Sequence, residues 1–75
     1  MAQIQKKVID NLAHILYDNG LKTTSYNDEA AMIILSKIGA SNEVKQAFTT
    51  YSFEVFMALV RIETTEQIHK MFKPI

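Results

Sequence analysis

The chain has 75 residues, which is room for one small domain spanning residues 1–75. Hydrophobic residues make up 48% of the chain, which favours a folded protein. Eight Lys and Arg residues balance eight Asp and Glu residues, so the chain lacks the excess of basic residues that most nucleic-acid-binding proteins have. No cysteine is present, which excludes disulfide bonds, thiol nucleophiles and Cys-ligated metal sites.

The first predicted element is a helix over residues 2–19. Placed at about 100° per residue, its apolar side chains gather on one side: Ile4, Val8, Leu12 and Ile15. Gly20 follows, and glycine commonly ends a helix in the left-handed backbone conformation. Leu21 is then positioned to contact Leu16, as in a Schellman ending.

A second helix is predicted over residues 26–38. Two caps are available for its start, either Ser25 together with Asp28, or Asn27 alone, because these side chains accept hydrogen bonds from the first free N–H groups of a helix. Gly39 is positioned to end it.

Three shorter helices are predicted in the rest of the chain. Ser41 suits the cap of a helix over residues 42–48, and Ser52 that of a helix over residues 53–62. Thr64 with Gln67 forms the sequence pattern of a capping box, which predicts a last helix over residues 65–73. No segment alternates as a strand would, so the fold class is all-α, a compact bundle of four or five short helices that is not a coiled coil.

The sequence lacks the residue patterns of common catalytic and metal sites. The two histidines, His14 and His69, have no His or Cys at helical ligand spacing, and Asp10, His14 and Asp18 are spread over roughly 12 Å of helix. Neither glycine belongs to a nucleophile elbow or a phosphate-binding loop. We therefore expect no catalytic, cofactor-binding or metal-binding residues, and we expect that the protein is not an enzyme.

Residues 30–48 suggest an alternative function, a DNA-binding regulator of the helix-turn-helix kind. The stretch from Leu35 to Ser41 has the apolar residue, the glycine and the serine cap of such a turn. However, the following segment carries Lys45 where a core residue belongs and has no arginine to contact bases or phosphates. These residues argue against nucleic acid as a partner.

The apolar residues are distributed over more helix surface than a small bundle easily buries. Ile33 lies on the far side of its helix from Ile34 and Leu35. The 53–62 helix has two apolar sides, one formed by Phe53, Phe56, Met57 and Val60, and one formed by Val55, Leu59 and Ile62. Either this helix is central and Ile33 is a single exposed residue, or a second chain covers part of this surface.

We favour the second alternative and expect a protein–protein interaction module that acts as a regulator, an inhibitor or an accessory subunit. The predicted partner-binding residues are Ile33, Val55, Leu59, Ile62, Phe48 and Tyr51. The partner is either a second copy, giving a homodimer, or a different protein. A small enzyme, a ligand carrier and a structural subunit remain alternatives.

The predicted location is the cytoplasm. The longest apolar runs, over 30–35 and 55–60, fall far short of the roughly 20 residues that span a bilayer. The first seven residues lack the apolar stretch that is typical of a secretory signal. Short, neutral, cysteine-free helical chains are also found among bacteriophage accessory proteins, antitoxin-like inhibitors and lysis-timing or host-takeover regulators. That association rests on composition alone.

Overall fold

The computed structural model describes the backbone of residues 2–72 and the side chains of residues 6–72. Two predicted features lie outside these ranges, the side chain of Ile4 and the helix end at Lys73. The described chain forms a bundle whose elements are, in order, α1 (Ala2–Asp18), the short 3-10 helix η1 (Thr23–Ser25), α2 (Asp28–Lys37), α3 (Asn42–Thr50) and α4 (Ser52–Met71). Residues 2–72 contain no strand, and the all-α prediction is confirmed.

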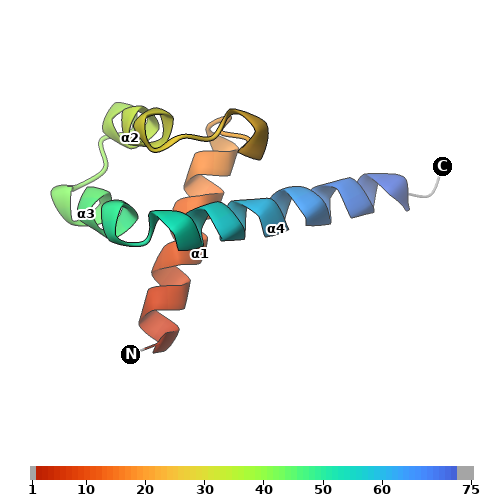
Figure 1. The fold of residues 1–75 in the computed structure, drawn as a ribbon, viewed down its shortest axis with the longest axis horizontal. Coiled ribbons are helices and arrows are strands. Elements are labelled where there is room, and N and C mark those ends of the chain that lie inside the picture. The colour runs from red at the N-terminus through yellow and green to blue at the C-terminus, as the bar shows by residue number, and fades with distance from the viewer. Residues whose placement is uncertain (1, 73–75) are drawn as a thin grey trace.

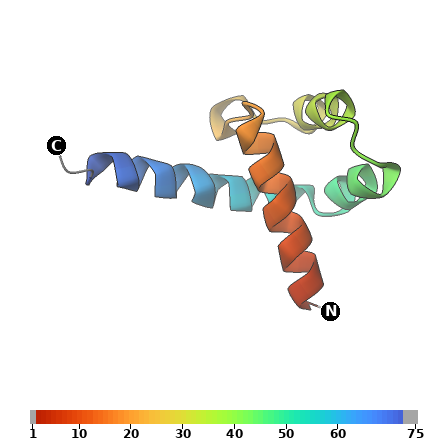
Figure 2. The same cartoon turned by 180° about the vertical axis from the view of Figure 1, so that it is seen from behind.

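The two longest helices, α1 and α4, cross each other and hold the fold together. Figures 1 and 2 show the crossing from opposite sides, with α3 beside the start of α4 and α2 packed against α1 and α3. The core lies between these helices and is formed by Leu12, Ala13, Leu16, Leu21, Ala31, Leu35, Phe48, Val55, Ala58 and Leu59. The second half of α4 extends away from the other elements (Figure 1).

Both glycines end a helix as predicted. Gly20 has a φ of 98°, and the N–H of Leu21 donates to the carbonyl of Leu16 at 3.0 Å. Gly39 has a φ of 77°, and the N–H of Ala40 donates to Leu35 in the same way, at 2.9 Å. These bonds are those of the Schellman motif. The first turns the chain out of α1, and the second turns it from α2 towards α3.

Two of the predicted caps are formed. Asn27 alone caps α2, because its side chain accepts the N–H of Ala30 at 2.7 Å. Ser41 caps α3 by accepting the N–H of Val44 at 3.2 Å. The prediction for Ser52 is wrong. It is the first residue of α4, because α3 continues to Thr50, beyond the predicted end, and leaves a single residue between the two helices.

The predicted division between 53–62 and 65–73 is also wrong, because α4 runs without a break for 20 residues, or about 30 Å. Thr64 and Thr65 do not cap a new helix. Their hydroxyls donate to the carbonyls of Val60 and Arg61, each at 2.9 Å, within the same helix. A threonine can make this i−4 bond in a helix interior. No glycine or proline stands nearby to break the helix.

The connection between α1 and α2 is fixed to α4 by polar and aromatic contacts. The carboxylate of Glu63 accepts two hydrogen bonds from Thr23, one from its backbone N–H at 2.6 Å and one from its side-chain hydroxyl at 3.1 Å. The ring of Tyr26 lies 4.9 Å from that of Phe56, and its hydroxyl donates to the carbonyl of Ser52 at 3.2 Å. Burial, together with the nearby carboxylate of Asp28, raises the pKa of Tyr26 to about 12. These contacts cover one flank of α4.

Candidate protein-binding surface

One apolar side of α4 forms the core. Val55 and Leu59 are fully buried, and Ile62 is half-buried and packs on the same core cluster. Our prediction had placed these three residues on a partner-binding surface, and the structure corrects it for Val55 and Leu59. The reason is the crossing with α1, which covers this side of α4.

The two aromatic residues predicted to bind a partner lie inside the fold as well. Phe48 is 1% exposed and is one of the largest buried side chains, so the structure also corrects its placement on a binding surface. Tyr51, at the junction of α3 and α4, is half-buried and packs on the same core. Both residues serve the packing of α3 against the rest of the bundle.

Ile33 lies where the sequence placed it, on the outward side of α2, with 58% of its surface exposed. The same helix buries Ala31 and Leu35 on its inward side. Around Ile33 runs a shallow groove lined by Glu29, Met32, Ser36 and Lys37. Ile38, just past the end of α2, is also exposed. A small apolar patch with charged edges therefore faces water on α2.

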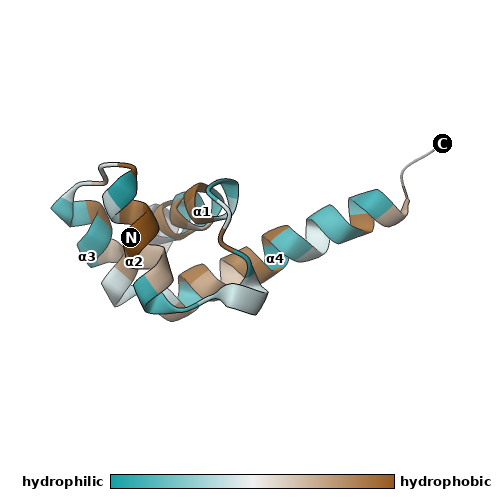
Figure 3. Ribbon diagram, turned by 90° about the horizontal axis from the view of Figure 1, so that it is seen from above, coloured by the Kyte–Doolittle hydropathy of each residue, from teal (hydrophilic) through white to brown (hydrophobic). Residues whose placement is uncertain are grey.

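The largest exposed apolar surface follows the side of α4 that points away from α1. We call it the outer face, and it consists of Phe53, Met57, Thr64, Ile68 and Met71, which fall within about 60° of one another around the helix. Phe53 is 68% exposed and Met71 76%. Phe72, 77% exposed, adjoins its far end. Figure 3 shows the hydrophobic bands recurring along α4, onto its projecting half.

Sequence reasoning had identified Phe53 and Met57 as an apolar side but missed that it continues to Ile68 and Met71. The reason was the predicted break near Thr64, which divided the surface between two helices. The lack of any glycine or proline between Gly39 and Pro74 was the signal for a continuous helix.

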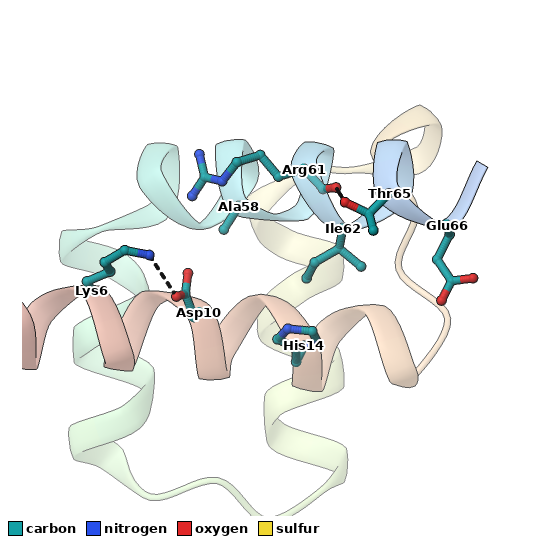
Figure 4. A pocket seen from close by; sticks show the side chains of 8 residues that line it. All are labelled: Lys6, Asp10, His14, Ala58, Arg61, Ile62, Thr65 and Glu66. Atoms are coloured by element: carbon teal, nitrogen blue, oxygen red, sulfur yellow. Dashed lines mark hydrogen bonds and ion pairs between the residues drawn. The ribbon is translucent and has the colours of Figure 1, made fainter. Parts of the chain in front are cut away.

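A second candidate site is the open groove where α1 and α4 cross. Lys6, Asp10 and His14 line it from α1, and Arg61 and Glu66 are among the residues that line it from α4 (Figure 4). Lys6 and Asp10 form an exposed ion pair at 3.2 Å. Among the described residues, no three His, Asp or Glu side chains are arranged to hold a metal ion. The groove therefore presents solvated charges of both signs.

The helix proposed for DNA contact, α3, presents a polar surface to water. Its exposed residues are Asn42, Glu43, Gln46, Thr49 and Thr50. Lys45, its basic residue, is half-buried. Phosphate contacts usually come from exposed lysine and arginine side chains, and α3 exposes neither. This arrangement does not favour DNA binding.

Within the described chain, no helix is both long enough and apolar enough to cross a membrane. The chain matches no protein family, no curated protein and no solved structure. Its function therefore has to be argued from its own residues.

Proposed function

We propose that this protein is a non-enzymatic protein–protein interaction module that acts as a regulator, an inhibitor or an accessory subunit. The observation that carries this proposal is the outer face of α4, with Phe53, Ile68 and Met71 exposed on a helix that already buries its opposite side in the core. Exposed apolar surface of this extent typically marks an interaction site.

The free energy available from covering this face is large enough for specific binding. Burying one large apolar side chain contributes roughly 1.5–3 kcal/mol. Phe53 and Met71 are 68% and 76% exposed, so most of that contribution remains available at each. With Met57 and Ile68 added, several kcal/mol can offset the entropy lost on association, and micromolar binding corresponds to about 8 kcal/mol.

The polar groups of the molecule support the non-enzymatic part of the proposal. His14 lies exposed in the same groove as the Lys6–Asp10 ion pair. Catalytic groups usually act in sites that exclude water, because charge stabilisation is weak in a high dielectric. For the DNA-binding alternative, no specific observation adds support. We also propose that the protein acts in the cytoplasm, where a fold that needs no disulfide bond can be stable.

Capture experiments with surface variants test the proposal. The tagged chain is used to isolate binding proteins from a lysate of its source organism, beside Ile33→Asp, Phe53→Asp and the control Gln46→Asp, an exposed change on α3. We expect the wild type and the control to retain a partner that at least one of the two apolar-surface variants loses. Ile34→Asp, at a half-buried position, should unfold the chain.

Two outcomes would contradict the proposal. One is a wild-type chain that stays monomeric and retains no protein above the background of a tag-only control. The other is a retained protein that all the folded variants bind equally well. Circular dichroism of each variant establishes that it is folded before capture is compared.

A further inference from the structure

We infer that the outer face of α4 binds a second copy of this chain, so that two α4 helices pack antiparallel. The two-fold axis crosses the outer face at the height of Ile62, whose own side chain packs on the core at the opposite side of the helix. The inference rests on the proposed function and names the partner for that surface. It follows from how the apolar residues are spaced along α4, from the uncovered half of the helix, and from the area that pairing would bury.

The apolar residues of the outer face are spaced almost symmetrically about the middle of α4. Phe53 and Met71 each lie nine residues from Ile62, while Met57 and Ile68 lie five and six residues from it. An antiparallel pair centred there places Phe53 of each copy opposite Met71 of the other, and Met57 opposite Ile68. A surface that matches itself in this way is what a two-fold interface requires.

Beyond the groove with α1, the last turns of α4 project from the other described helices. We call residues 64–71 the α4 arm, and every residue from 64 to 72 is exposed. Figures 1 and 3 show the arm extending clear of the other helices. In proteins, most of the stability of a helix comes from packing of its apolar side against other elements. In the antiparallel pair, each arm packs on the first half of the other copy's α4, which supplies such packing.

The first half of α4 is open to receive that arm. Phe53 is 68% exposed and Met57 39%, and helical periodicity places both on the side of α4 opposite the buried Val55 and Leu59. The contacts of η1 with Glu63 and of Tyr26 with Phe56 lie on a flank of the helix, to one side of the outer face. They leave the outer face free and provide it with a rigid support.

The area available agrees with a modest but specific dimer. The four apolar residues of the outer face and Phe72 expose about 600 Å² of accessible surface on each copy, as their exposed fractions give it. If pairing covers all of it, the two copies together bury about 1,200 Å². This is at the lower limit of stable protein–protein interfaces, which bury roughly 1,200–2,000 Å² in total. We therefore expect a dimer with a Kd in the micromolar range.

Complementary charge variants test both the partner and the antiparallel arrangement. Phe53→Asp places a carboxylate in the first turn of α4, and Met71→Lys places an ammonium in its last turn, where the helix dipole favours each charge. Both variants should fold but be monomeric in sedimentation equilibrium at concentrations where the wild type is dimeric. Each should weaken self-association at least tenfold, whereas Gln46→Asp should not change it.

Mixing the two variants gives the decisive result. A heterodimer of Phe53→Asp and Met71→Lys has one unmodified Phe–Met end and one end where the new carboxylate faces the new ammonium. We expect the mixture to dimerise although neither variant does so alone. Two monomeric variants that stay monomeric when mixed would overturn the antiparallel arrangement, and a monomeric wild type would overturn the second copy as partner.

Cysteine cross-linking checks the register in this cysteine-free chain. Met57→Cys and Ile68→Cys should form a mixed disulfide when combined, much faster than either variant alone. Failure of these tests is distinguishable from failure of the proposed function. If the chain is monomeric but Phe53→Asp abolishes capture of a different protein, the surface binds a partner and only the inference of a second copy is wrong.

Discussion

Replacing Leu59 by alanine tests which side of α4 forms the core. Leu59 is fully buried, and truncation of such a leucine typically costs roughly 2–5 kcal/mol, through lost transfer free energy and the cavity left behind. A domain of 75 residues has a total stability of about 4–11 kcal/mol. We expect Leu59→Ala to remove about 3 kcal/mol and to lower the Tm by roughly 10–20 °C.

Met57→Ala is the matched control on the same helix. Methionine and leucine have similar helix propensities, so the backbone effect of alanine is nearly equal at both positions. Because Met57 is 39% exposed and therefore only partly buried, its truncation should cost about 1–2 kcal/mol, clearly less than that of the fully buried Leu59. Urea unfolding followed by circular dichroism, at a few micromolar protein to limit association, measures both. Equal losses for the two variants, or a larger one for Met57→Ala, would refute the assignment of the core side.

Three further predictions concern helix ends and the junction with α4. Thr64→Ala should raise stability by a few tenths of a kcal/mol in urea unfolding, because Thr64 lies inside a helix; a loss of about 1 kcal/mol would instead identify it as a cap. Gly20→Ala and Gly39→Ala should each cost about 1 kcal/mol in the same assay, purely from the positive φ, since no atom lies within 4 Å of the added methyl group. Tyr26, with its pKa raised to about 12, should ionise later than a free tyrosine on ultraviolet titration. The pKa of Tyr26 in the folded state exceeds its value of about 10 in the unfolded state. The protonated hydroxyl of Tyr26 therefore contributes fully to stability below pH 10, and this contribution is lost as the pH rises towards 12. The variant Tyr26→Phe should not show this loss.

The local features of this fold were predictable because each depends on a few neighbouring residues. Gly20 and Gly39 end helices in the left-handed conformation, and Asn27 and Ser41 bond to N–H groups only three residues away. Thr64 shows the limit of such rules. The same hydroxyl can cap a new helix or bond to the preceding turn, and here it bonds to Val60.

The binding surface was only partly predictable, because it depends on contacts between distant parts of the chain. Periodicity identified two apolar sides on the segment around Val55 and Phe53, but both are rich in large apolar residues. Only the crossing with α1 decides that Val55 and Leu59 are buried while Phe53 is exposed. The exposure of Ile33 could be predicted because most apolar residues of α2 lie on one side of the helix, which therefore faces the core and leaves Ile33 on the opposite side.

Sedimentation equilibrium of the wild-type chain over a wide dilution series tests the central claim most directly. If another α4 covers the outer face, the average molecular mass should change reversibly from that of one chain to that of two chains as the protein concentration rises through the micromolar range. A mass of 8.6 kDa at every concentration up to about a millimolar would contradict it.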